Sequence, residues 1–224
     1  MSPTPSLAVA PPQRAAAMRF IMLVVLIDML AIGVIVPVLP ALVGKFAANT
    51  AEQTYWYGVI VFTFAIANFF ALPVLGALSD RFGRRSVLLL GFCGLALNFF
   101  MTALASAMWM LVLSRLIGGA MQSNAAVANA YVADITPADE RAKRFGLLGA
   151  MFGIGFILGP VVGGLLGGID LRLPFFVSGC LALANLAYGY FVLPESLPVE
   201  KRSARFEWSH ANPVGSLKLL RSYP

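Results

Sequence analysis

Two charged side chains, Asp28 and Arg115, stand inside long runs of apolar residues, and they are the only charges of the sequence placed so. A charged group at the centre of a bilayer is energetically costly, so it marks a functional site by default. An aspartate can take up and release a proton there, and a nearby arginine would hold the carboxylate in its ionised form. Counted at about 1.5 Å per residue, the two side chains differ in depth by about 7 Å, within reach of an arginine or one water molecule. The pair predicts a membrane-embedded site for a proton or a substrate.

Arg115 also begins a polar stripe, because Gln122 and Asn129 follow it at intervals of seven residues. On a continuous helix with about 100° per residue, the three side chains lie within about 40° of one another. Lipid offers such groups no partners, so the stripe must face protein or water. The alternative is a buried structural arginine paired with backbone carbonyl groups. Asn68, in another apolar run, either packs between helices or lines the same cavity.

The densest group of charges, residues 76–86, separates two apolar runs; we name it the charged loop. Gly76 and Gly83 in this loop permit close backbone approach and positive φ. Asp80 can accept hydrogen bonds from the backbone N–H groups at the start of the next helix. Asp134 ends another run at the same depth and is the natural acidic partner of the arginines. The plainer alternative is a tight hairpin that only obeys the positive-inside rule. The residues of the charged loop that carry the prediction are Gly76, Asp80, Arg81, Gly83, Arg84 and Arg85.

Glycine recurs every fourth residue at Gly155, Gly159 and Gly163. Small residues at this spacing let two helix backbones approach closely, so the stretch predicts a packing seam. Pro160 lies within the same run, where it removes a backbone donor and bends the helix. With Gly164 the stretch reads Gly-x-x-x-Gly-Pro-x-x-Gly-Gly, a pattern more selective than the glycine spacing alone.

The elements that position these residues follow from composition. Of 224 residues, 59% are hydrophobic and 12% charged, and the mean hydropathy is +0.84. A helix needs about 20 apolar residues to cross ~30 Å of hydrocarbon, and it satisfies its own backbone hydrogen bonds there. We therefore expect an all-α integral membrane protein, a bundle of six transmembrane helices. The six apolar runs are residues 20–43, 57–78, 86–108, 109–133, 145–169 and 173–193.

The basic residues are distributed unevenly between these runs. If residues 1–18 form a disordered segment in the cytoplasm, most of the 16 Lys and Arg residues are cytoplasmic as well. The positive-inside rule then places both termini there, with residues 195–224 as a cytoplasmic linker. The net charge of +6 thus reflects topology and not nucleic-acid binding. His210 is the only histidine, and Cys93 and Cys180 lie in apolar runs, so we expect no metal site, no disulfide and no cofactor.

The charged loop resembles the loop between the second and third helices of the major facilitator superfamily of secondary transporters. Asp28, residues 111–119 and the Leu-Pro-Glu-Ser stretch at 193–196 also match that family. The glycine pattern matches the fifth helix of its drug:proton antiporter branch, and residues 129–141 look closest to the tetracycline-efflux transporters. Family members consist of two pseudo-symmetric halves. The chain resembles the N-terminal six-helix half, so a C-terminal half is an expected partner.

The resemblance also implies roles for single residues. In this family the first and fourth helices line the central cavity, which would bring Asp28 and Arg115 together there. The family's loop is a conformational latch with an acid of the fourth helix against its arginines. The charged loop and Asp134 would therefore form a cytoplasmic gate.

The implied function is export of a hydrophobic, tetracycline-like drug, free or as a Mg²⁺ complex, in exchange for protons. The location would be the bacterial inner membrane, and the consequence antibiotic resistance. Two alternatives stay open: a facilitator for another small metabolite, and a half-transporter or interaction subunit without transport of its own. We do not expect an enzyme, because a reaction in the bilayer needs more reactive groups than two charged residues supply.

Overall fold

The computed structural model describes residues 11–122 and 124–203, and all regular structure within these ranges is helical. Five of the helices are long and apolar enough to cross a membrane: α1, α2, α3, α6 and α7. The shorter α4 and α5 follow each other through the fourth predicted span. The predicted all-α bundle is thus confirmed. The elements are α1 (Pro11–Gly44), α2 (Thr50–Phe82), α3 (Arg84–Ala103), α4 (Met108–Met121), α5 (Asn124–Ile135), α6 (Arg141–Ile169), α7 (Leu173–Val192) and the short 3-10 helix η1 (Val199–Lys201).

Several helix ends differ from the predicted ones. α1 begins at Pro11, so the end of the segment predicted to be disordered, residues 1–18, is helical. Proline suits the first turn of a helix, where its missing N–H would have had no partner. Residues 1–10, and residues 204–224 of the predicted linker, lie outside the described residues. The fourth span, predicted as one helix, stops at Met121 and restarts at Asn124.

α2 begins earlier than predicted because the preceding residues supply a cap. Oδ1 of Asn49 accepts a hydrogen bond from the N–H of Glu52 at 2.9 Å, and Oε2 of Glu52 accepts one from the N–H of Ala48 at 2.7 Å. This reciprocal arrangement satisfies N–H groups that a helix start leaves free, and it places an acid in the first turn. The N-terminal end of α2 is therefore determined locally.

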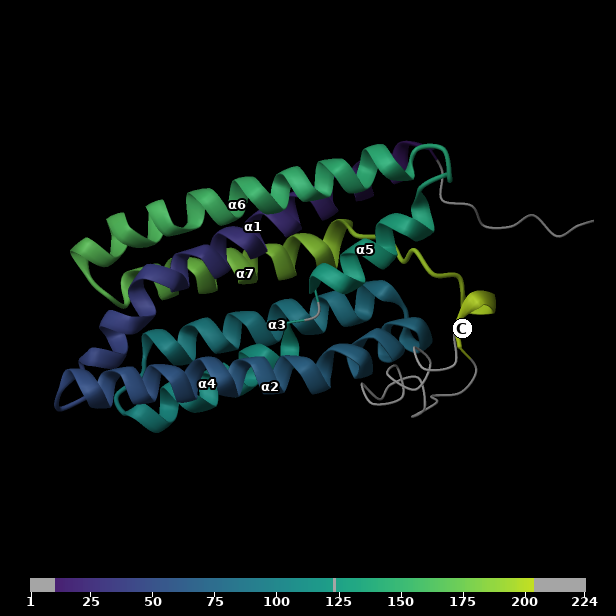
Figure 1. The fold of residues 1–224 in the computed structure, drawn as a ribbon. Coiled ribbons are helices and arrows are strands. Elements are labelled where there is room, and N and C mark those ends of the chain that lie inside the picture. Colours follow the sequence, from purple (N-terminus) through teal and green to yellow (C-terminus); the bar gives the residue numbers. More distant parts are fainter. Residues whose placement is uncertain (1–10, 123, 204–224) are drawn as a thin grey trace, which may run out of the picture.

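The helices pack in pairs, with α1 along α6, α2 along α4 and α3 along α7. Figure 1 shows α1 and α6 on one side of the bundle, α2 and α4 on the other, and α3 and α7 between them. The core divides along the helix axes into two clusters, one around Phe20 and Tyr131 and the other around Leu42 and Phe99. Asp28 and the α4–α5 break lie where the two clusters meet. They are therefore near the middle of the bundle.

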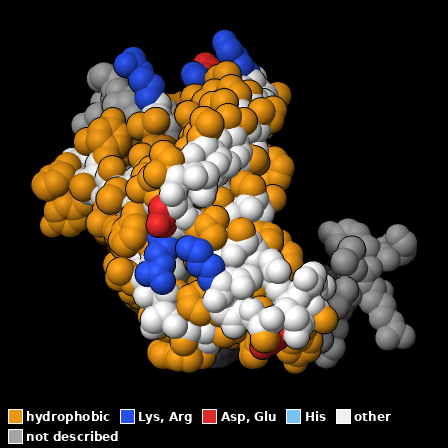
Figure 2. Space-filling model, turned by 90° about the vertical axis from the view of Figure 1, so that its left-hand side faces the viewer, with side chains coloured by type: hydrophobic (Ala, Val, Ile, Leu, Met, Phe, Trp, Pro, Cys, Tyr) orange, Lys and Arg blue, Asp and Glu red, His pale blue; other side chains and the backbone are white. Residues whose placement is uncertain are grey.

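Much of the outer surface is apolar. Only 17% of the spanning window is buried in α2, and the same share in α6. Their exposed side chains include Phe62 and Phe69 on α2, and Ile157, Val161 and Leu165 on α6. Figure 2 views the bundle from one end and shows hydrophobic side chains gathered along its flanks, with few charged groups among them. Such a surface is suited to lipid or to another helical unit rather than to water.

Candidate functional site

The break in the fourth span is held by a side chain from another helix. Gln122 ends α4 with φ −83° and ψ 66°, so the α-helical path does not continue through it. Nδ2 of Asn68, on α2, donates to the carbonyl oxygens of Gly119 at 3.3 Å and of Gln122 at 3.0 Å. These are carbonyl groups that a helix end leaves without intrahelical partners. Asn68 thus acts between helices, the first of its two predicted roles.

The break also overturns the predicted polar stripe. Arg115 is on α4, Asn129 is on α5, and Gln122 occupies the interruption between them. A common face needs an unbroken helix, which is absent here. Arg115 is only 4% exposed, whereas Asn129 is exposed and Gln122 is intermediate. The three side chains therefore do not share one face.

Arg115 does not pair with Asp28 in the described part of the chain. Its Nη2 donates to Oγ1 of Thr102, on α3, at 2.9 Å. The Thr102 hydroxyl lies in turn 3.0 Å from Oγ of Ser114. Arg115 is thus a buried arginine, as in the alternative weighed for it, but its partner is a hydroxyl and not a backbone carbonyl. The depths of Asp28 and Arg115 along their spans were compatible with a pair. However, Arg115 lies against α3 and not against α1.

Asp28 has a polar neighbour, Asn124, which sequence reasoning misses. Asp28 is 5% exposed and Asn124, the first residue of α5, is 2% exposed. A signal for the break was present, because residues 122–124 are three consecutive polar residues within an apolar run.

The glycine seam of α6 packs on α1. A Cβ atom added to Gly155 would lie 2.6 Å from the carbonyl oxygen of Leu26, and one added to Gly163 would lie 2.5 Å from that of Val34. At Gly159 an added Cβ would lie 2.6 Å from both the Leu30 oxygen and the Gly33 Cα. These three glycines therefore lie directly against α1, whose contacting surface contains a glycine of its own, Gly33.

Gly164 does not belong to the seam. No atom of the described chain lies within 4 Å of a Cβ added there, so this glycine faces away from α1. On a helix, adjacent residues point about 100° apart, so the last two glycines of the pattern cannot both face one neighbour. Pro160 does belong to the seam, because its ring lies 2.9 Å from a Cβ added to Gly33.

The charged loop turns at Gly83, whose φ of +99° is the only positive value among the described residues. This conformation favours glycine, as predicted. Gly76 lies inside α2, and a Cβ added to it meets no atom of the described chain within 4 Å, so no close approach is made there within this part of the protein. α3 begins directly after Gly83, and its first N–H, on Arg84, donates to Oε1 of Glu195 at 2.9 Å. Glu195, not Asp80, therefore caps α3.

Arg84 is the centre of an ion-pair network. Its Nη1 lies 2.6 Å from Oδ1 of Asp80, and its Nε lies 3.2 Å from Oδ2 of Asp134. The predicted contact between the loop and the end of the fourth span is therefore present. Nη2 of Arg85 donates to the carbonyl oxygen of Tyr190 on α7 at 2.6 Å. Arg81, by contrast, is exposed, and its guanidinium stacks 5.3 Å from the centre of the Phe82 ring.

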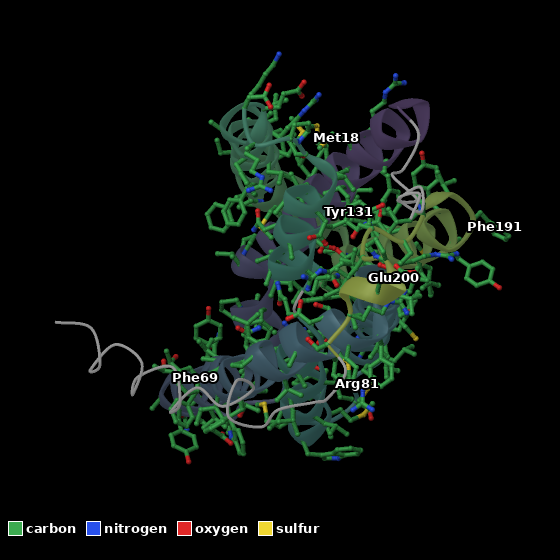
Figure 3. The ribbon with its side chains drawn as sticks, turned by 90° about the vertical axis from the view of Figure 1, so that its right-hand side faces the viewer. Met18, Phe69, Arg81, Tyr131, Phe191 and Glu200 are labelled. Carbon is green, nitrogen blue, oxygen red and sulfur yellow. The ribbon has the colours of Figure 1, made fainter. Side chains whose placement is uncertain are left out.

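The segment after α7 closes over the charged loop. Oε1 of Glu195 also accepts from the N–H groups of Ser196 at 3.0 Å and Leu197 at 3.1 Å. The hydroxyl of Tyr131 donates to the carbonyl oxygen of Pro194 at 2.9 Å, which attaches the segment to α5. Figure 3 shows this end of the bundle, with Tyr131 near its centre and Arg81 toward its edge. Sequence reasoning misses Glu195; the available signal was an acid directly after the proline that follows the last span.

A bundle of apolar spans with a buried acid beside a discontinuous helix has the architecture of a secondary transporter. The family model of the Major Facilitator Superfamily matches residues 21–224 of this chain. The chain therefore belongs to this family of transporters, which are not enzymes, and it corresponds to the N-terminal six-helix half of the family's fold.

Known relatives agree with this assignment. The chain is 41% identical over 197 residues to the class C tetracycline resistance protein of Escherichia coli, covering 88% of this chain and 49% of that protein. It is 34% identical to multidrug resistance protein 2 of Bacillus subtilis (strain 168), covering 80% of this chain and 44% of that protein. The crystal structure of the human organic anion transporter MFSD10 superposes with a TM-score of 0.81 at 28% identity, covering 95% of this chain and 55% of that one. The chain thus spans about half the length of the curated relatives it matches.

Proposed function

We propose that this chain is the N-terminal half of a transporter that exports a hydrophobic, tetracycline-like drug in exchange for protons. The observation that carries the proposal is Asp28, a buried carboxyl group at the middle of the bundle with an uncharged amide as its neighbour. Such a group can be neutral or ionised without breaking an ion pair. Identities of about 40% to tetracycline resistance proteins of several classes support the drug class.

The proposal includes the second half of the transporter, its central cavity and its orientation in the membrane. A C-terminal six-helix half would cover the apolar faces of α2 and α6, and the central cavity would lie between the halves. Asn129, exposed on α5, would line that cavity, while the drug would enter free or bound to Mg²⁺. Both termini would be cytoplasmic, in a bacterial inner membrane. Basic residues support this topology, because the end of the bundle that bears the charged loop also carries Arg141, Lys143 and Arg144.

Transport by inside-out membrane vesicles tests the proposal. Vesicles that contain the full-length protein should accumulate tetracycline when their interior is acidified, and a proton ionophore should abolish the accumulation. Vesicles without the protein provide the control. Uptake that reaches equilibrium but ignores the pH gradient would identify a facilitator instead, and no uptake by a correctly inserted protein would leave an interaction subunit.

We further propose that Arg84, Asp80, Asp134 and Glu195 act as a gate that is closed in one conformation and open in another. Arg84 and Asp134 are partly exposed, with side-chain exposures of 12% and 25%. Partly exposed pairs contribute about 1 kcal/mol or less, which suits a contact that must break in each cycle. In the alternative, in which the charged loop is only a static hairpin, the same contacts would join α3 to α5 permanently and would not open during transport.

A double-mutant cycle on the transport rate distinguishes these roles. Arg84→Ala and Asp134→Ala should each slow turnover with little loss of drug affinity, and the double variant should be no worse than the more damaging single one. Arg81→Ala combined with Asp134→Ala is the matched control. Arg81 belongs to the same loop but makes no ion pair among the described residues, so these losses should add. Strict additivity for Arg84 and Asp134 would show that they do not act as a pair.

A further inference from the structure

A small cavity lies at the end of the bundle that bears the charged loop. Its volume is about 180 Å³, and its wall is formed by the last turn of α5, the first residue of α6 and the segment after α7. Asp134 and Arg141 both line this cavity, and Ser196 is its third polar side chain. Among the described residues, Asp134 and Arg141 form no ion pair with each other. An acid and an arginine thus share one space while each is held by other partners.

Asp134 is held by the proposed gate. Its Oδ2 accepts from Nε of Arg84 at 3.2 Å and from the hydroxyl of Ser196 at 3.3 Å. Arg84 is the only cation that pairs with this carboxylate in the part of the chain that the structure describes. The side chain of Asp134 is 25% exposed, and a charge that is mostly buried is costly without a partner. If Arg84 left, Asp134 would lose its counter-charge.

Arg84, by contrast, has a second acid. Its Nη1 lies 2.6 Å from Oδ1 of Asp80 and donates to the hydroxyl of Ser79 at 2.6 Å. Both of these partners belong to the last turn of α2. Arg84 therefore stays paired when it leaves Asp134, whereas Asp134 does not. Opening of the gate requires a replacement cation for Asp134.

Arg141 is placed to be that cation. Its Nη2 donates to the carbonyl oxygen of Ala133, the residue directly before Asp134, at 3.3 Å, and its Nε donates to that of Thr136 at 3.3 Å. Both distances are at the long end for such bonds, and both acceptors are neutral carbonyl groups at the end of α5. Hydrogen bonds from an arginine to a carboxylate are shorter and about twice as strong. Arg141 would therefore gain by moving from these carbonyl groups to Asp134.

The other basic residues around this cavity are less suited to the role. Arg144, one turn further along α6, pairs with Glu140 at 2.9 Å, and Arg202, in the segment after α7, lies 3.6 Å from Glu195. Lys143 is two residues from Arg141, about 200° around the helix, and does not line the cavity. Arg141 is thus the arginine that shares the cavity with Asp134 and has no acid of its own among the described residues.

We propose that Asp134 exchanges Arg84 for Arg141 when the gate opens, an inference that rests on the proposed gate. Arg84 keeps Asp80, and Arg141 crosses the cavity to Asp134. Both acids then have an arginine in both conformations. The exchange keeps the two conformations close in free energy, as a switch that reverses in every cycle requires. A gate that left Asp134 unpaired would be held closed.

The accessibility of α5 from the cytoplasm tests this exchange. Asn129, exposed on the same helix, is replaced with Cys in a full-length protein whose other cysteines are replaced with Ala. In inside-out vesicles the cytoplasmic face points outward, so the initial rate of reaction with a membrane-impermeant maleimide measures how often the gate is open. Arg84→Gln, Arg141→Gln and the matched control Lys143→Gln are compared in this background. The measurement needs neither a drug nor a pH gradient.

The two arginine variants should change the labelling rate in opposite directions. Arg84→Gln removes the closed-state partner of Asp134 and should raise the rate about two- to fivefold, the range typical of partly exposed ion pairs. Arg141→Gln removes the open-state partner and should lower the rate by a similar factor. In Asp134→Asn, which has no charge to exchange, Arg141→Gln should have no further effect. Lys143→Gln should leave the rate unchanged.

A purely structural role of Arg141, as a cap on the carbonyl groups of α5, predicts a different result. Such a cap does not need the charge of Asp134, so an effect of Arg141→Gln that persists in Asp134→Asn would overturn the proposal. No change in the rate, or a change in the same direction as for Arg84→Gln, would overturn it as well. If Arg141→Gln does not reach the membrane, adding Ala142→Arg restores the positive charge of this segment, and the comparison is repeated.

The exchange and the transport function fail separately. Opposite changes in labelling without proton-driven uptake of tetracycline would refute only the transport function. Proton-driven uptake together with labelling changes of one direction would refute only the exchange. A rate that does not respond to Arg84→Gln would show that this ion pair is not a gate, and the exchange would be refuted with it.

Discussion

Replacing Asp28 with Asn should abolish tetracycline uptake driven by a pH gradient in vesicles. The substitution preserves the shape of the side chain, but it removes the group that carries the proton. The amount of protein in the membrane should stay the same or rise, because an amide is less costly to place in hydrocarbon than a carboxylate. Quantitative immunoblots of the vesicles, together with initial uptake rates, provide both measurements.

Asp28→Glu is the informative control. It retains a titratable carboxyl group, so part of the gradient-driven uptake should survive at a rate reduced by the longer side chain. Binding of the drug to Asp28→Asn should persist, since the proposed defect lies in coupling and not in insertion or folding. Uptake by Asp28→Asn at the normal rate would remove this residue from the mechanism and leave the facilitator as the better account.

Replacing Gly159 or Gly163 with Leu should prevent α6 from packing on α1 and cause loss of the folded protein. Overpacking a core costs about 1–3 kcal/mol where side chains can yield. The obstacles here are backbone atoms of residues 30–34, at 2.5–2.6 Å from an added Cβ, so the cost should exceed that range. Even Ala introduces this Cβ, so we expect each Gly→Ala variant to be clearly destabilised. Thermal unfolding of the purified protein, followed by tryptophan fluorescence, measures the loss.

Gly164→Leu is the matched control for that prediction. It makes the same substitution one residue further along the same helix, where an added Cβ meets nothing within 4 Å in the described chain. In the 224-residue chain, where no second half covers this face of α6, the melting temperature of Gly164→Leu should remain near that of the unaltered chain. If Gly163→Leu were as stable as Gly164→Leu, α6 would not pack on α1 through its glycines.

The apolar spans, the all-α class and the glycine at the turn of the charged loop were predictable from the sequence, and each has a local cause. Hydrocarbon requires every backbone group of a spanning segment to be paired within that segment, so a run of about 20 apolar residues specifies a helix without reference to its neighbours. The turn between α2 and α3 requires a positive φ, which glycine adopts at no steric cost. The presence of a seam on α6 is also local, because it follows from the spacing of its glycines.

The partners of these elements were decided by the tertiary structure. The fourth span stops at Met121 because the side-chain amide of Asn68, far away in the sequence, donates hydrogen bonds to the carbonyl groups that the helix end leaves free. α3 is capped by Glu195 and not by the nearby Asp80, because the chain returns to Gly83 after α7. Arg115 binds Thr102, and Asp28 meets Asn124, although the depth of the charges in the spans was compatible with an Asp28–Arg115 pair. A helix satisfies its backbone from within, whereas a buried polar side chain depends on whichever helix lies beside it, and that neighbour is selected by the packing of the whole bundle.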